Sequence, residues 1–221
     1  MSRLIQILIA AVIVMGGLQW LVPRVAGSLL AHQLGRLDHG PKPMVAVQAV
    51  PFWALFSGRF QDIGVNAQNA DLKALNVQHI RMNWSNGKVS MGSLEKGKLL
   101  IEKPGRFRAT VVVTGTALSQ FLAKKGRIMH PKVTIAPSGV SMSGRIQLGG
   151  TTVPLDTKGS LVRSSNHQAL IFHPTSIDGL NLPVLTDVQL FNLNTLHLPM
   201  PIGILRIRLE SGNRLALAVG N

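Results

Sequence analysis

Arginine offers the most specific chemistry in this chain. Five arginines follow a glycine or alternate with apolar residues, as in a strand with one polar face: Arg59, Arg106, Arg108, Arg206 and Arg208. A guanidinium group is planar and matches the oxygen geometry of a phosphate group. These five residues are therefore candidate ligands of a phosphodiester or of an anionic bilayer surface.

Catalytic and metal-binding patterns do not appear elsewhere in the sequence. The seven histidines are scattered, none lies in an HExxH pattern, and the chain has no cysteine. The segment 139–144 (GVSMSG) resembles a nucleophile elbow, but its second glycine is misplaced and the segment has the pattern of a strand. Neither GxxxxGK[ST] nor GxGxxG occurs. We predict no catalytic residue, metal site or cofactor. A catalytic pair of carboxylates is left open, because two carboxylates can meet in the fold without being close in the sequence.

The charge of the chain points to polyanionic partners. A net charge of +14, from 23 Lys and Arg against 9 Asp and Glu, attracts nucleic acid, anionic lipid headgroups or acidic glycans. The same excess is also explained as a solubilising surface charge. Nucleic-acid binders cluster their cations and add stacking aromatics, whereas here the cations are spread and aromatic residues make up 5% of the chain. We therefore predict no nucleic-acid partner.

The chain begins with an apolar segment. Residues 4–22 contain no charged residue, and their number matches the hydrocarbon core of a bilayer. Residues 1–23 are thus a signal peptide or an uncleaved anchor, and the lack of a clear cleavage site favours the anchor. Residues 24–43 are expected to form an amphipathic helix and a linker. Counting Lys and Arg would keep the rest of the chain on the cytoplasmic side.

Residues 44–221 have the pattern of antiparallel β-structure. Apolar residues recur at every second position between turn signals such as Asn86-Gly87, Pro104-Gly105 and Ser211–Asn213. Asn86-Gly87 predicts a hairpin, after which Val89 and Met91 resume a strand. A slip in the alternation predicts a β-bulge near Gln78-His79.

Two short helices interrupt the strands. The first is an apolar plug over Pro51–Phe56, which Gly58 closes and in which Pro51 suits the first helical position. The second covers Ala117–Lys125, with Thr116 as the expected N-cap. Its lysines lie at the C-terminal end, where the helix dipole favours them.

The apolar plug also carries a resemblance to a known family. Pro51-Phe52, Leu55 and Gly58–Phe60, after an apolar N-terminus and before repeated strands, resemble the LmeA-like phospholipid-binding family of the bacterial cell envelope. The resemblance runs from Arg24 to the C-terminus. It implies an α+β, mainly antiparallel β fold, with a curved sheet or half-barrel similar to tubular lipid-binding proteins. It also implies a domain outside the cytoplasm, in the periplasm or cell envelope, contrary to the Lys/Arg count.

The resemblance implies that apolar side chains contact lipid. The candidates are aromatic or flexible apolar residues: Phe52, Trp53, Leu55, Phe56, Met82, Met91 and Met142. Methionine adapts to irregular apolar surfaces, and a concave apolar pocket is the usual site of a small ligand. From composition and alternation alone, the same residues are explained more simply as the filling of a sandwich core.

Two functions follow as expectations. The first is noncatalytic binding, or transfer, of a phospholipid in an apolar groove at the cell envelope. The alternative is a membrane-anchored scaffold that binds an envelope protein or an anionic polymer. The first predicts apolar space inside the sheet, and the second predicts a filled core. An enzyme acting on envelope lipid or glycan comes third, because no catalytic set can be assembled.

Overall fold

The computed structural model describes residues 44–221 apart from residues 50, 73–74, 96–99, 127, 149, 178–186 and 197–199. The expected anchor (1–23) and the expected amphipathic helix and linker (24–43) lie outside the described residues, so both stay predictions. Within the described part of the chain, no helix combines the length and the apolar character that crossing a bilayer requires.

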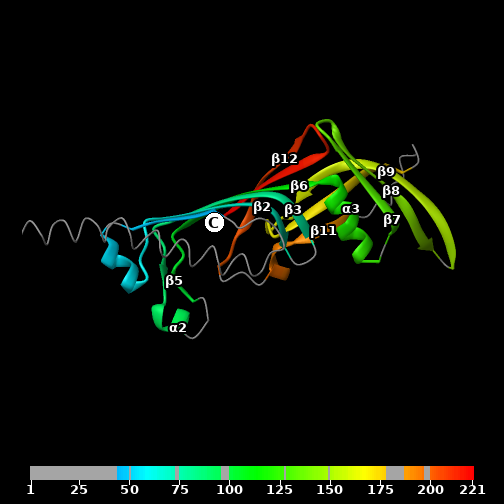
Figure 1. Cartoon of the computed structure of the whole chain (residues 1–221). Coiled ribbons are helices and arrows are strands. Elements are labelled where there is room, and N and C mark those ends of the chain that lie inside the picture. Colours follow the sequence, from blue (N-terminus) through cyan, green and yellow to red (C-terminus); the bar gives the residue numbers. More distant parts are fainter. Residues whose placement is uncertain are drawn as a thin grey trace, which may run out of the picture.

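Two antiparallel sheets form most of the molecule (Figure 1). The six-stranded sheet has the order β1–β2–β3–β6–β13–β12, and the five-stranded sheet has the order β11–β10–β9–β8–β7. The strands of the first sheet are β1 (Met44–Gln48), β2 (Asp62–Leu72), β3 (Leu75–Ser85), β6 (Arg106–Thr114), β12 (Gly203–Glu210) and β13 (Arg214–Gly220). Those of the second are β7 (Met129–Ala136), β8 (Gly139–Leu148), β9 (Thr151–Arg163), β10 (Ala169–Ile177) and β11 (Val188–Asn192). The curled, half-barrel arrangement with few helices confirms the predicted mainly antiparallel β fold.

The predicted apolar plug is a 3-10 helix, η1 (Phe52–Ser57). Our placement of Pro51 at the first helical position is wrong: Pro51 is the extended N-cap, and its carbonyl accepts the hydrogen bond of the Ala54 N–H at 3.0 Å. Gly58 ends the helix as predicted, with φ 75°. A Cβ at Gly58 would lie 1.9 Å from the Val89 carbonyl oxygen, so both the left-handed turn and the close approach require glycine.

The Asn86-Gly87 turn does not close the predicted hairpin. β3 pairs with β6, and the chain between them leaves the sheet as an arm, whose described elements are β4 (Lys88–Val89), α2 (Met91–Glu95) and β5 (Ile101–Lys103). Asn86 has the positive φ of a turn residue, 55°, but its N–H donates to the Gln61 carbonyl at 2.9 Å and holds the turn to the start of β2. The strand predicted through Met91 is therefore wrong, because the chain has already turned away from β3.

Helix α3 (Gly115–Lys124) packs against β7, β3 and β6. Its N-cap is Thr114, whose hydroxyl accepts a hydrogen bond from the Ala117 N–H at 3.1 Å, and not Thr116 as predicted. The helix begins earlier because Gly115 permits a close approach: a Cβ there would lie 2.5 Å from the Val133 carbonyl oxygen. The apolar residues Leu118, Phe121 and Leu122 of this helix are buried.

One apolar cluster, which we call the main core, fills the space between the two sheets and α3. Its most enclosed members, at most 1% exposed, come from β3, β6, α3, β10, β11, β12 and β13: Val77, Val113, Leu118, Leu170, Phe172, Leu190, Ile204 and Leu215. Burying one such side chain contributes about 1.5–3 kcal/mol, which makes this cluster the main source of stability.

The alternation slips in β3 where we predicted a bulge, but the register does not shift. Gln68 pairs with His79 and Ala70 pairs with Val77, so neither strand gains a residue relative to the other. Asn69, with φ 55°, lies between the two pairs on β2. In both strands the alternation of inward and outward side chains therefore shifts by one residue at the same place, and the buried face stays continuous.

Asn213 joins the two sheets at the turn between β12 and β13. Its side-chain oxygen accepts a hydrogen bond from the Ile135 N–H of β7 at 2.7 Å, and its carbonyl accepts one from the Gly115 N–H at 2.9 Å. Its φ of 60° is left-handed, a conformation that asparagine tolerates. Asn213 thus positions the turn, α3 and β7 together.

Replacing Asn213 tests this junction. Asn213→Gly keeps the left-handed backbone but leaves the Ile135 N–H without its acceptor, which is expected to lower the free energy of unfolding by about 1–3 kcal/mol. Asn213→Asp, the matched control, keeps an acceptor oxygen and should lose much less. Denaturant unfolding of both variants checks this, and equal losses in the two would contradict the role of the side-chain oxygen.

Candidate functional site

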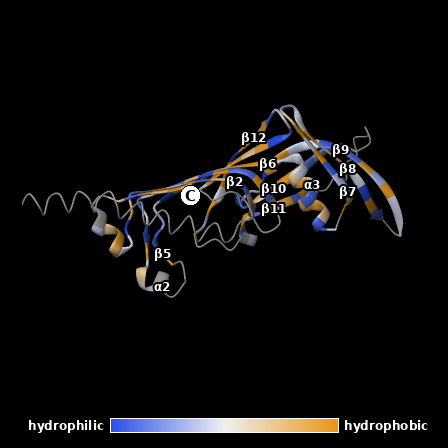
Figure 2. Cartoon of the chain, viewed as in Figure 1, coloured by the Kyte–Doolittle hydropathy of each residue, from blue (hydrophilic) through white to orange (hydrophobic). Residues whose placement is uncertain are grey.

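Cross-strand pairing places apolar residues in rows on one face of the six-stranded sheet. One row crosses all six strands: Val45, Val65, Met82, Ala109, Val219 and Ile204. The neighbouring row crosses four strands: Val47, Ile63, Trp84 and Phe107. Directly paired residues project from the same face of a sheet. We call this face the inner face; Figure 2 shows the alternation of apolar and polar residues along the strands that produces it.

The inner face extends past the main core. Five of its side chains are half-buried and form what we call the apolar strip: Val45, Ile63, Val65, Met82 and Phe107. Met82 and Phe107 pack against the main core. The other three side chains belong to β1 and β2 and lie beyond the main core. At the far end of the strip, Trp84 is buried and contacts Phe60 edge to face, with ring centroids 4.6 Å apart. The strip therefore runs from the main core toward the end of the sheet that carries η1.

The structure distributes the predicted lipid-contact residues over three places. Met82 lies in the apolar strip, whereas Met142, only 2% exposed, lies within the main core. Met91 is half-buried in α2. In η1, Trp53 is 53% and Phe56 68% exposed. Leu55 is half-buried in the same helix, and the side chain of Phe52 lies outside the described residues. The lipid contacts of all seven stay predictions.

Four of the five predicted phosphate ligands lie on the opposite, outer face. Arg106 and Arg108 of β6 and Arg206 and Arg208 of β12 are exposed and stand at positions that alternate with the inner rows. A row of the outer face runs through Arg81, Thr110, Ala218 and Arg206. The sheet thus separates these arginines from the apolar strip. Among the described residues, no carboxylate forms an ion pair with them.

Arg59, the fifth predicted phosphate ligand, lies instead where η1 meets the arm. It is exposed and forms an isolated β-bridge with Lys88. The Val89 N–H donates to the Gly58 carbonyl at 3.0 Å, which fixes the end of η1 against β4. Lys88 in turn forms an ion pair with Glu102 of β5, and the hydrogen bond from Lys88 lowers the pKa of the Glu102 carboxyl group.

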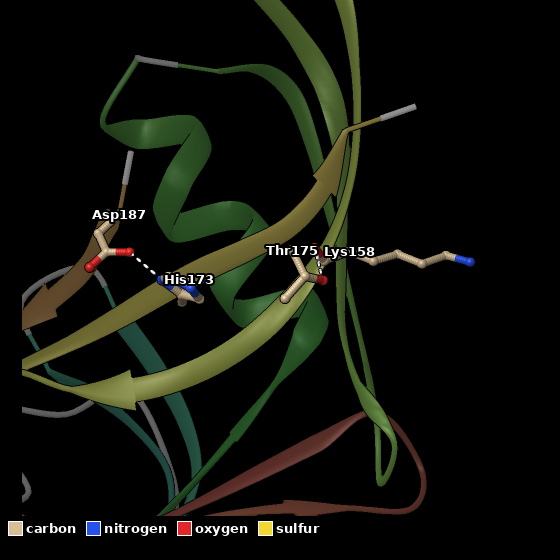
Figure 3. Close-up of polar contacts among 4 residues, drawn as sticks. All are labelled: Lys158, His173, Thr175 and Asp187. Carbon is tan, nitrogen blue, oxygen red and sulfur yellow. Dashed lines mark hydrogen bonds and ion pairs between the residues drawn. The ribbon is translucent and has the colours of Figure 1, made fainter. Parts of the chain in front are cut away.

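A histidine–carboxylate pair lies elsewhere, between β10 and β11. His173 Nδ1 and an Asp187 carboxylate oxygen are 2.6 Å apart, and both side chains are about half exposed (Figure 3). The neighbouring Thr175 hydroxyl donates to the Lys158 carbonyl at 3.1 Å, as Figure 3 shows, so it is not oriented as a nucleophile by this imidazole. Among the described residues, no group of three His, Asp or Glu side chains is placed to hold a metal ion.

A curled antiparallel sheet with a half-buried apolar strip on its inner face suits a protein that holds an apolar ligand. The chain matches the family model described as LmeA-like phospholipid-binding over residues 15–213, and it belongs to that family. The resemblance seen in the sequence is thereby confirmed. No curated protein and no solved structure matches the chain.

Sequence reasoning missed most of the apolar strip. Val45, Ile63, Val65 and Phe107 were expected to be strand residues, but only the register of four strands shows that they share a face with Met82. Arg81 was also missed. Its position between the inward Ile80 and Met82 is the signal that could have placed it on the outer face.

The Lys88–Glu102 pair makes a pH-dependent prediction for the arm. Because the folded pKa of Glu102 is lowered, the stabilisation from this pair is present above the ordinary carboxyl pKa and is lost as the pH falls through the folded value. In Lys88→Met, the pKa of Glu102 should rise toward its ordinary value. NMR titration of the Glu102 carboxyl carbon measures this.

Lys103→Met is the matched control, because Lys103 pairs across the arm with Lys88 and not with Glu102. It should leave the titration of Glu102 unchanged. A Glu102 pKa that stays lowered in Lys88→Met would show that another group causes the shift.

Proposed function

We propose that this protein binds a phospholipid, without catalysis, by laying an acyl chain along the apolar strip of the six-stranded sheet. The observation that carries the proposal is the apolar strip itself, which continues the buried core with side chains that are only half-buried. Membership of a phospholipid-binding family supports lipid as the ligand class. The site of action in this proposal is the bacterial cell envelope, with the chain held by its apolar N-terminal segment.

The chemistry of the strip supports an acyl chain. Val45, Ile63 and Val65 are branched apolar residues and Met82 is flexible, so together they offer a continuous apolar surface that can adapt to a hydrocarbon. An acyl chain that covers the strip removes apolar surface from water, and each Å² removed contributes about 25 cal/mol of favourable free energy. Binding in this way needs no bond to be made or broken. It also suits either storage or transfer of the lipid.

A charge in the strip should prevent lipid binding. In Met82→Lys, an ammonium group replaces an apolar side chain on the inner face, so the full chain should copurify with several-fold less phospholipid. Asn83→Lys is the matched control, because Asn83 is the next residue of β3 and is exposed on the outer face. Native mass spectrometry and lipid extraction measure the bound lipid, and circular dichroism checks the fold. Equal lipid content in the two folded variants would contradict the proposal.

The outer face favours a second candidate function, a scaffold for an anionic polymer or protein. Its exposed arginines lie in cross-strand rows and, among the described residues, have no carboxylate partner. Guanidinium groups arranged in this way bind anionic groups by charge-assisted hydrogen bonds. This candidate needs no apolar ligand and is compatible with lipid binding on the opposite face.

Neutralising the outer face tests the second candidate. The triple variant Arg81→Gln, Arg108→Gln and Arg206→Gln should elute from a heparin column at clearly lower salt than the unaltered chain, because it lacks three cations of one surface. Its bound phospholipid should not change, since none of the three lies on the inner face. Unchanged heparin retention would exclude this face as the polyanion site.

A further inference from the structure

We propose that η1 and the arm together form a membrane-docking tip, which inserts apolar side chains into the interfacial layer of an anionic bilayer. The tip consists of the apolar residues Trp53, Phe56 and Leu100 together with the cations Arg59 and Lys103. This inference rests on the proposed function, because it names the surface through which the lipid of the apolar strip would be exchanged.

Backbone hydrogen bonds join the parts of the tip. The Val89 N–H donates to the Gly58 carbonyl at 3.0 Å, which fixes η1 to β4. The Ser90 N–H donates to the Leu100 carbonyl at 2.9 Å, which fixes β4 to the start of β5. Figure 1 shows η1, drawn in blue and cyan, and α2 projecting from the same side of the six-stranded sheet, at the end remote from α3. Residues far apart in the sequence are thus held as one unit.

The apolar side chains of this unit are each more than half exposed. Trp53 is 53%, Leu100 55% and Phe56 68% exposed, the highest values among the large apolar residues of the described chain after Met44. An exposed tryptophan and an exposed phenylalanine on one short helix are costly in water. Aromatic rings, tryptophan above all, favour the headgroup level of a bilayer.

The charges of the tip select the partner. Arg59 and Lys103 are exposed, and within the described residues neither forms an ion pair, while Glu102 is neutralised by Lys88. Exposed apolar side chains in the same unit as cations that lack an ion pair match an anionic membrane surface, which offers phosphate groups above a hydrocarbon layer. A partner protein in water would not need this combination of exposed aromatic and cationic groups.

The tip also meets the apolar strip. Phe60, two residues after the end of η1 at Gly58, contacts Trp84, which stands in the same row as Ile63 and Phe107 of the strip. A bilayer in contact with the tip would therefore lie next to the end of the strip. This gives an acyl chain a short apolar path from the membrane to the sheet.

A fluorescent label at position 56 tests the tip in the full chain. Since the chain has no cysteine, Phe56→Cys can be labelled there alone with a nitrobenzoxadiazole dye. Thr110→Cys on the outer face and Thr151→Cys in the β8–β9 hairpin are control positions, and both are exposed. Each protein is reconstituted into vesicles of phosphatidylglycerol and phosphatidylcholine, with and without doxyl-labelled phospholipid as a membrane quencher.

We expect the label at position 56 to brighten severalfold and to be quenched by the doxyl lipid, while labels at positions 110 and 151 stay accessible to aqueous iodide. Adding Arg59→Gln and Lys103→Gln should lower the ratio of inserted to free label roughly 30-fold, because two cations near an anionic surface are lost. A label at position 56 that stays in water overturns the proposal. So does insertion of the label at position 110, or protection of position 56 without vesicles, which would indicate a protein contact.

Native mass spectrometry of the same samples separates this inference from the proposed function. Bound phospholipid together with a water-exposed label at position 56 would refute the tip and leave lipid binding in place. An inserted label without bound phospholipid would refute the apolar strip as a lipid site and leave the tip in place.

Discussion

Cross-strand hydrogen bonding holds the six-stranded sheet in a register that aligns apolar residues in rows across neighbouring strands. A shift of one residue in any strand would move that strand's apolar set to the opposite face, so the register decides what the sheet can bind. The five-stranded sheet and α3 bury one part of the inner face. Val45, Ile63 and Val65 continue the same face beyond that part and stay half-buried. The candidate lipid site is thus an extension of the core, built by the same alternation.

The same register divides the chemistry of the molecule between two faces. Guanidinium groups of β3, β6 and β12 project from the outer face, so they cannot reach a headgroup whose acyl chain lies on the strip unless the lipid passes around an edge. The cations at the η1 end are different, because Arg59 and Lys103 lie beside the end of the strip. An amphiphile would therefore find apolar surface along the sheet and charge at its end, which is the order in which a phospholipid presents its own groups.

The sequence predicted the class of fold well, because alternation and turn residues are local properties. The family was also recognisable from the short motif around η1. Local signals gave wrong predictions where a contact with a distant part of the chain determines the structure. Asn86-Gly87 turns toward β2 instead of closing a hairpin. Helix α3 begins at Gly115 because β7 and Asn213 approach this glycine closely. The burial of individual side chains could not be predicted either. Met82 and Met142 have the same strand environment in the sequence, yet Met142 lies in the closed core and Met82 in the strip.

The position of a bound acyl chain on the protein decides whether the apolar strip is the lipid site. The full chain can be loaded with a phospholipid that carries a photoreactive diazirine on its acyl chain, irradiated, digested and mapped by mass spectrometry. If the acyl chain lies on the apolar strip, adducts will form on inner-face residues such as Val65, Met82 and Phe107, and none on the outer-face residues Arg81 and Thr110. Adducts confined to the outer face, or an inner face that takes no adduct while lipid is bound, would contradict this position of the acyl chain.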